Sequence, residues 1–244
     1  MNNKRALITG ASGGIGRAIA LRLAADGFDV AACYYSDDAG AEKLGKELEK
    51  LGVKFRLYKA DVSDYRQVEK IFTDAFDFFG GIDVLVNNAG MAQQKLFTDI
   101  SEEEFDRICA VNFKSVYNCC KFAVPGMVSR KSGKIINISS MWGVSGASCE
   151  TVYSATKAAV IGLSKALGKE LAPSNVQVNC IAPGAIDTKM NSNLSDEDKA
   201  AFAEEIPAGR FGTPDEIAGI VSFLAGKDSA YITSQTVIAD GGFI

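Results

Sequence analysis

The stretch that decides the fold is RALITGASGGIGRAIALRLAADG, residues 5–27. A short apolar run meets a glycine cluster, and apolar residues then recur at helical spacing as Ile15, Ile19 and Leu23. A buried parallel strand followed by a glycine turn and a helix gives this pattern, with Gly27 as the helix stop. The stretch therefore predicts the first strand–turn–helix unit of an α/β fold.

The glycine turn itself is TGASGGIG, with Gly10, Gly14 and Gly16 as the spaced glycines. One glycine allows the tight turn, a second lets the backbone approach a pyrophosphate, and a third lets the helix pack closely. The N-terminus of the helix adds free N–H groups and a positive dipole. A purely structural turn is the alternative, but the place between the first strand and first helix favours a dinucleotide site.

Strand-like and helix-like segments alternate along the rest of the chain, which predicts a doubly wound parallel sheet of Rossmann type with helices on both faces. We expect strands near residues 29–35, 54–61, 83–90, 134–140, 176–184 and 235–242, and helices near 40–52, 68–80, 101–113, 152–171 and 213–225. The helix at 101–113 is expected to run on toward the sequence VPGM. The long stretch 185–211 is either a binding lid or a variable insertion with a short helix of its own.

Composition limits the class of protein. A length of 244 residues suits a single domain over residues 1–244, and the net charge of −4 argues against a nucleic-acid binder. Six cysteines without a CxxC pair, in a chain without histidine, predict no metal site and indicate reduced thiols of a cytoplasmic protein. The N-terminus shows no signal sequence, and no apolar run is long enough for a membrane span, so no membrane partner is expected.

Two further strand ends carry polar residues. Asp61 ends the third strand, where a carboxylate can meet an adenine amino group; it could also cap the next helix, as could Ser63. The sequence NNAG, residues 87–90, ends the fourth strand and would face the same crevice, or it is only a turn.

Together with the residues below, these motifs make the chain resemble the short-chain dehydrogenase/reductase family over essentially its whole length. The resemblance rests on the order and spacing of TGASGGIG (9–16), Asp61-Val62, NNAG (87–90), Asn112, Ser140, the Tyr153…Lys157 pair, Pro183-Gly184 with Thr188, and DGG (240–242). Within the family it is most similar to the bacterial 3-oxoacyl-[acyl-carrier-protein] reductase branch. The family implies seven parallel strands and a homotetramer, with the helices around 102–129 and 152–171 at one contact and the end 241–244 at another.

The resemblance also implies site residues. Gly10, Ser12, Gly14, Ile15 and Gly16 would hold the pyrophosphate side, Asp61 and Val62 the adenine, and Asn88, Ala89 and Gly90 the ribose and nicotinamide. Pro183, Gly184, Ile186 and Thr188 would close over the carboxamide. Asn112, Ser140, Tyr153 and Lys157 would form the catalytic tetrad.

The resemblance makes Tyr153 the group that carries the proton in a chain without histidine. A free phenol titrates near pH 10, and a nearby ammonium together with an oxidised nicotinamide would lower the pKa into the working range. Positions i and i+4 share a helix face, so Lys157 can stay beside Tyr153. Ser140 would hydrogen-bond the substrate carbonyl, and Asn112 would hold the helix and a proton-relaying water. A Tyr–Lys pair at this spacing is otherwise ordinary packing.

The cofactor interpretation favours NADP(H) over NAD(H). NAD-selective family members carry an acid at the end of the second strand, where this chain has Tyr34 or Tyr35. Many NADP(H) members carry arginine where this chain has Gly13. We expect the phosphate to meet Ser36 and Arg17 instead.

The predicted substrate is a small-molecule or carrier-bound ketone, first a 3-oxoacyl thioester. Arg130 and Lys131 are expected near the entrance for a carrier protein, while Ser174 replaces a second basic position. Trp142 and Met190 could line an acyl pocket or belong to the core.

Glu150, three residues before Tyr153, is either a carboxylate at a helix N-terminus or a pocket anion for a cationic substrate. The sequence around it also resembles a branch proposed to reduce a 5-aminopentanone modification on a lysine of translation elongation factor P. A non-catalytic nucleotide sensor is a third hypothesis, which the complete tetrad disfavours.

Overall fold

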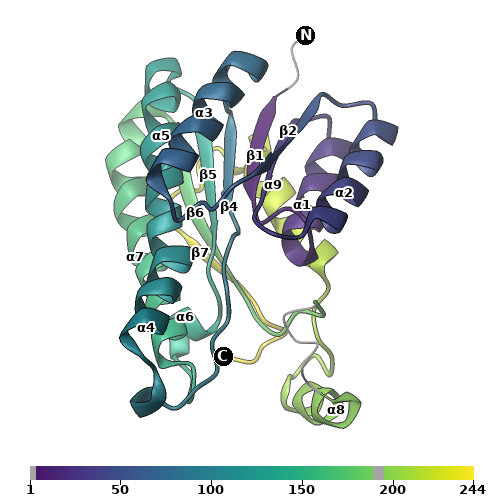
Figure 1. The fold of residues 1–244 in the computed structure, drawn as a ribbon, viewed down its shortest axis with the longest axis vertical. Helices are drawn as coiled ribbons and strands as arrows, with labels where there is room; N and C mark the ends of the chain where they lie inside the picture. The colour runs from purple at the N-terminus through teal and green to yellow at the C-terminus, as the bar shows by residue number, and fades with distance from the viewer. Residues whose placement is uncertain (1–3, 189–194) are drawn as a thin grey trace.

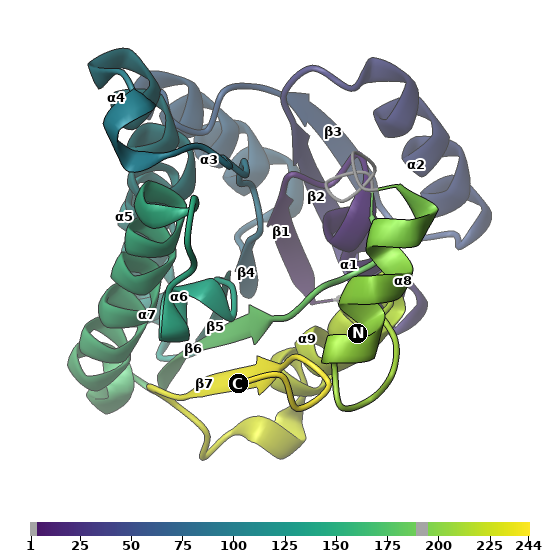
Figure 2. The same cartoon turned by 90° about the horizontal axis from the view of Figure 1, so that it is seen from below.

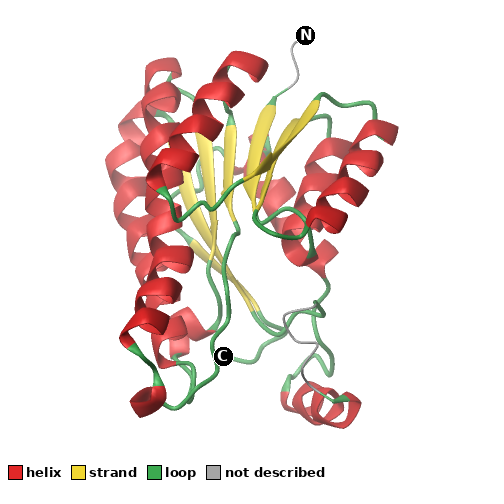
Figure 3. Ribbon diagram, viewed as in Figure 1, coloured by secondary structure: helices red, strands yellow, loops and turns green. Residues whose placement is uncertain are grey.

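The computed structural model describes residues 4–188 and 195–244. Its centre is a parallel sheet of seven strands in the order β3-β2-β1-β4-β5-β6-β7. The order reverses between β1 and β4, so a crevice opens at the carboxyl ends of these two strands. The predicted α/β Rossmann fold is confirmed (Figures 1 and 3).

The strands lie close to their predicted positions. They are β1 (Arg5–Thr9), β2 (Asp29–Tyr34), β3 (Phe55–Lys59), β4 (Val84–Asn87), β5 (Gly133–Ile138), β6 (Val176–Pro183) and β7 (Thr236–Ala239). The helices are α1 (Gly14–Ala25), α2 (Asp38–Lys50), α3 (Tyr65–Phe79), α4 (Glu102–Cys109), α5 (Ser115–Arg130), α6 (Trp142–Ser145), α7 (Thr151–Leu171), α8 (Asp196–Glu205) and α9 (Pro214–Ala225). Short 3-10 turns occur at Phe97–Asp99, Ala172–Ser174 and Lys227–Ser229.

Alternation along β1 shows how the sheet buries both of its faces. Ala6 and Ile8 point into one core with residues of α1 and α9, whereas Leu7 points into the other core with residues of α3, α5 and α7. Successive side chains of a strand point to opposite faces, so near-continuous apolar strands need helices on both sides. Figure 1 shows these two helical layers on either side of the sheet.

The predicted helix from residue 101 toward VPGM is confirmed, with one irregularity. Ser101 and Glu104 form the capping box expected at its start. A π-helical turn, Ala110–Lys114, joins α4 to α5, and it contains Asn112. Such turns often occur at functional sites. The stretch 185–211 contains α8, the short helix that one of the two interpretations expected.

Candidate active site

A cavity of about 1120 Å³ lies at the carboxyl edge of the sheet, the edge seen in Figure 2. Most of the predicted residues line it, although they come from the first, middle and last thirds of the chain. These are Gly10, Gly13, Gly14, Ile15, Asn88, Ala89, Gly90, Ser140, Trp142, Glu150, Tyr153, Lys157, Pro183, Gly184, Ile186 and Thr188.

The glycine loop meets the physical requirements of a pyrophosphate site. Gly10 and Gly14 have positive φ angles of 65° and 52°, a conformation that side chains disfavour. A Cβ on Gly16 would overlap the carbonyl oxygen of Gly10, so only glycine lets α1 start this close to the loop.

The start of α1 also suits an anion. Its N-cap residue, Gly13, has no side chain that could cap the helix, and the first turn contains no acidic residue. The first amide groups of the helix are therefore not used by a side-chain cap, and no carboxylate of this turn repels an anion. Free N–H groups and the helix dipole are what a dinucleotide pyrophosphate needs, so the residues present fit a nicotinamide dinucleotide.

Tyr153, Lys157 and Ser140 meet on one wall of the cavity. Tyr153 and Lys157 lie on the same face of α7, with the Lys157 ammonium 5.7 Å from the centroid of the Tyr153 ring. Lys157 Nζ donates to the carbonyl of Ile138, 3.1 Å away, at the end of β5. The Ser140 hydroxyl accepts from the backbone N–H of Trp142, so its own proton is free to donate.

Burial dominates the ionisation of this group of residues. It raises the pKa of Tyr153 to about 12, against the lowering effect of a hydrogen bond with Ser140. It lowers the pKa of Lys157 to about 8, because a buried ammonium loses its hydration. The expected lowering of the Tyr153 pKa by Lys157 is therefore not found in the chain itself, where desolvation is the larger effect.

Asn112 connects two segments of the chain by hydrogen bonds. Its side-chain oxygen accepts from the backbone N–H of Met91 at 2.8 Å, and its amide donates to the carbonyl of Met91 and to the hydroxyl of Thr156. The carboxamide thus ties the segment after β4 to α7, directly beside Lys157. The structural part of the prediction for Asn112, that it holds the catalytic helix, matches these contacts.

The predicted adenine end differs in detail from expectation. One oxygen of Asp61 accepts from the backbone and hydroxyl of Ser63, and the other pairs with Arg107 at 2.9 Å. The cap of α3 is Asp64, whose side chain accepts from two helix amides. The alternative in which Asp61 or Ser63 caps this helix is therefore wrong, since the helix starts one residue after Asp64. Val62 is buried next to this group.

The cations near the end of β2 are already paired. Arg17 forms an ion pair with Glu47, and Lys59 pairs with Asp38, which also hydrogen-bonds Tyr34. Arg17 is thus not the free cation expected for a cofactor phosphate. Ser12, Ser36 and the other residues of this end lie outside the lining of the main cavity.

The substrate side brings Trp142 and Glu150 into the cavity. Glu150 is half-buried, and burial raises the pKa of its carboxyl. It occupies the N-cap position of α7 without a side-chain capping hydrogen bond, and it also lines the cavity, so both interpretations of Glu150 match its position. Met190 lies outside the described residues.

The expected carrier-protein contact at Arg130 and Lys131 is not at this entrance. Arg130 donates to the carbonyl of Ile82, just before β4 begins, and β5 starts two residues after Lys131. Both side chains therefore belong to the amino edge of the sheet, whereas Ser140 follows its carboxyl edge.

Sequence reasoning missed several cavity residues, chiefly Phe202 and Glu205 of α8, Phe243 near the C-terminus, and Gln93 and Gln94 after β4. No local motif marks these positions, because they come from segments far apart in the chain. Only the apolar end at 241–244 gave a signal, and it was interpreted as a subunit contact.

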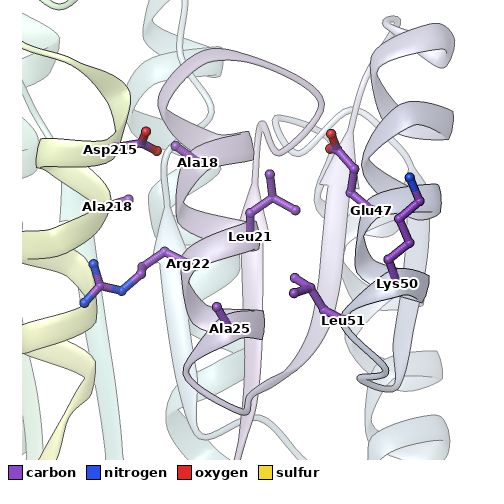
Figure 4. Close-up of a pocket in the computed structure, with 9 residues that line it drawn as sticks. All are labelled: Ala18, Leu21, Arg22, Ala25, Glu47, Lys50, Leu51, Asp215 and Ala218. Atoms are coloured by element: carbon purple, nitrogen blue, oxygen red, sulfur yellow. The ribbon is translucent and has the colours of Figure 1, made fainter.

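A second hollow, of about 520 Å³, lies over α1, α2 and α9 (Figure 4). Leu21 and Leu51 lie among charged side chains there, and none of the predicted site residues lines it. Within residues 4–188 and 195–244, no cluster of three or more metal-ligating side chains is found. In the same ranges, no helix combines the length and apolarity that crossing a membrane requires.

The fold, the glycine loop and the Ser–Tyr–Lys wall define a nucleotide-dependent oxidoreductase of Rossmann type. A family model described as enoyl-(acyl carrier protein) reductase matches residues 10–244. The chain is 43% identical over 239 residues to a 3-oxoacyl-[acyl-carrier-protein] reductase of Staphylococcus aureus, covering 98% of this chain and 97% of that protein.

Two further relatives extend the comparison. A protein of the same name from Thermotoga maritima is 40% identical over 244 residues, covering 100% of this chain and 99% of that one. A short-chain type dehydrogenase/reductase from Mycobacterium marinum superposes with a TM-score of 0.93 at 36% identity, covering 98% and 95% of the two chains. The chain belongs to the short-chain dehydrogenase/reductase family, which implies an NAD(P) cofactor.

Proposed function

We propose that the protein reduces a ketone to a secondary alcohol with NADPH, and that its substrate is a 3-oxoacyl thioester carried by an acyl carrier protein, as in fatty acid biosynthesis. The observation that carries the proposal is the convergence of Ser140, Tyr153 and Lys157 on one wall of a cavity that begins at the glycine loop. The names of the relatives from two organisms support the thioester.

The chain's own residues supply orientation and a proton. A bound nicotinamide supplies the hydride. The Ser140 hydroxyl donates to the substrate carbonyl oxygen, holding it beside the Tyr153 phenol. With a pKa of about 12 the phenol is protonated at neutral pH, so it can donate its proton to the developing alkoxide.

Lys157 assists by its charge. Below pH 8 the buried ammonium is protonated, and it stabilises the phenolate left after the transfer. Its hydrogen bond to Ile138 and the contacts of Asn112 to Thr156 fix its place on α7. Reduction therefore proceeds with no histidine in the chain.

NADPH is proposed over NADH because Tyr34 and Tyr35 stand where an acid would repel a 2′-phosphate. Asp37 is nearby, but its carboxylate is used in capping α2. A phosphate here would compete with Glu47 and Asp38 for the cations Arg17 and Lys59.

The deciding experiment is oxidation of NADPH with a short 3-oxoacyl thioester, run beside NADH. Rapid turnover with NADPH and at least tenfold slower turnover with NADH supports both parts of the proposal. Clear NADPH binding without turnover contradicts the thioester, and equal rates with both cofactors contradict the argument from Tyr34.

A second candidate substrate is an amine-bearing ketone, the 5-aminopentanone modification of elongation factor P. The observation that favours it is the charge of the cavity: Glu150 and Glu205 are acidic, and Lys157 is the only lysine or arginine among the described lining residues. An amine would be attracted to such a cavity, whereas an acidic carrier would not. Turnover of a neutral and an aminoalkyl ketone, compared side by side, separates the two candidates.

We further propose a cytoplasmic homotetramer without nucleic-acid or membrane partners. Phe105 on α4 and Tyr117 on α5 are about half exposed, which supports a subunit contact over these helices. Sedimentation equilibrium tests it: a monomer in solution overturns the assembly.

A further inference from the structure

The last residues of the chain form a turn with a defined conformation. The Asp240 carboxylate accepts from the backbone N–H groups of Gly242 at 3.0 Å and Ile244 at 2.8 Å. Gly241 has a φ of 71° and its carbonyl accepts from Ala208, at 3.0 Å. The turn therefore holds Phe243 in one place, at the wall of the main cavity.

Phe243 is the second ring in a row of four aromatic side chains. It meets Trp142 edge-to-face at 5.7 Å between ring centroids, and Phe202 of α8 in the same way at 5.6 Å. Phe202 in turn meets Phe211 at 5.5 Å. These are the separations and tilts at which aromatic pairs are attractive. The row joins the segment after the catalytic Ser140 to α8 through the C-terminal turn.

Three of the four rings line the main cavity and the fourth does not. Trp142, Phe202 and Phe243 line the cavity, whereas Phe211 is absent from its described lining and only supports Phe202. Each of the three lining rings is partly exposed, so a surface is left for a ligand after the contacts between rings are made. Trp142 contacts Ser140 and packs on the apolar cluster that contains Tyr153, so the three aromatic surfaces extend from these residues as an apolar wall for the part of a ketone that does not react.

We propose that Phe243 is a specificity-determining residue, the ring of this wall that contacts the apolar substituent of the ketone and limits its length. The proposal rests on the proposed ketone reduction and adds the substrate class: ketones with a short apolar chain next to the carbonyl. Removing the ring opens space for longer chains and removes contact with short ones. The preference between them is therefore expected to change by about tenfold, as one or two methylene groups do in an apolar pocket.

The test compares Phe243→Ala with Phe243→Leu, which retains most of the volume, and with Phe211→Leu, which perturbs the same row without touching the cavity. The measurement is kcat/KM with NADPH for 3-oxoacyl thioesters of four and ten carbons. We expect the ratio of long to short substrate to rise about tenfold in Phe243→Ala, less in Phe243→Leu, and not in Phe211→Leu. Equal changes for both substrates, or the same shift in Phe211→Leu, overturn the proposal.

A second readout does not need turnover. Trp142 is the only tryptophan in the sequence, so its fluorescence reports on this wall alone. Titration with 2-butanone and 2-decanone gives their relative affinities, and the same tenfold shift toward decanone is expected in Phe243→Ala. If the wild-type protein reduces neither thioester, the thioester part of the proposed function fails, while an unchanged affinity ratio in the titration overturns the role of Phe243.

Discussion

The glycine loop and the aromatic wall bound the same cavity, but they are built in opposite ways. The loop uses backbone: Gly10, Gly14 and Gly16 let the chain come close, and no side chain caps the amides at the start of α1. The wall uses side chains, and Trp142 and Phe243 come from segments far apart in sequence. Backbone can bind a group that every family member shares, whereas side chains can change with the substrate without disturbing the fold.

Tyr153 stands between these two regions, and its loss should have the largest effect. Tyr153→Phe removes the hydroxyl that we propose as the proton donor but keeps the ring that packs on Ile108 and Val152. We expect turnover to fall about 10³-fold, the usual contribution of a general acid, with NADPH affinity and unfolding midpoint nearly unchanged. Steady-state rates and cofactor titration measure both. A variant with full biological activity would instead favour the non-catalytic sensor.

The requirement for glycine in the loop is tested by Gly16→Ala. The added methyl group overlaps the Gly10 carbonyl and comes within 2.5 Å of the Asn88 amide, so the loop and the helix must separate. We expect NADPH affinity to fall about 100-fold and stability to fall by about 1–3 kcal/mol, as overpacking does.

Gly162→Ala is the matched control for Gly16→Ala. Gly162 lies on the exposed side of α7, and a Cβ there meets no described atom within 4 Å. It should bind NADPH normally and gain about 0.5–1 kcal/mol from helix propensity. Equal losses in the two variants, measured by cofactor titration and urea unfolding, would show that the loop has no special requirement for glycine.

Substrate recognition by side chains of the cavity is tested by Glu150→Gln. This change removes a charge at nearly constant volume from a side chain that makes no capping hydrogen bond. If an amine-bearing ketone is the substrate, its kcat/KM should fall about tenfold while that of a neutral ketone stays within twofold. Equal effects on the two ketones, in parallel assays, would remove Glu150 from substrate recognition.

The same contrast explains what could be predicted from sequence. The loop and the Tyr153–Lys157 pair depend on local spacing, because a turn fixes the glycines and i, i+4 positions share a helix face. Strand order and register then brought Ser140 to the same edge, as the family implied. Phe202 and Phe243 could not be predicted, since their proximity depends on how α8 and the C-terminal turn pack.

The wrong predictions have physical causes as well. Arg130 was expected near the entrance because it is close in sequence to Ser140. However, β5 lies between them and runs from the amino edge of the sheet to its carboxyl edge, so the two residues lie at opposite edges. Arg17 was expected to be free, but Glu47 of α2 neutralises it. The alternative in which Asp61 or Ser63 caps α3 fails because Asp64 immediately precedes the helix and accepts from its amides.

The last prediction concerns stability and Lys157, the one lysine or arginine among the described residues that line the cavity. Its pKa is about 8 in the folded chain and about 10.5 in the unfolded chain, so between these values the unfolded chain binds more protons. Stability therefore rises with pH in this window, because deprotonation relieves the cost of burying the ammonium. Relative to Lys157→Met, the wild-type free energy of unfolding should rise by about 1 kcal/mol from pH 7 to pH 9.

Taking the difference between wild type and Lys157→Met cancels groups that do not interact with Lys157. Cys180 does interact with it, but burial raises the pKa of this thiol to about 11, so the folded chain keeps it protonated through pH 9. Burial raises the pKa of Cys33 and Cys120 to about 12, and these thiols oppose stability at alkaline pH equally in both proteins. Urea unfolding at several pH values gives the difference directly. A difference that does not change with pH would mean that Lys157 is charged throughout, and that the ammonium beside Tyr153 is stabilised by more than the Ile138 carbonyl.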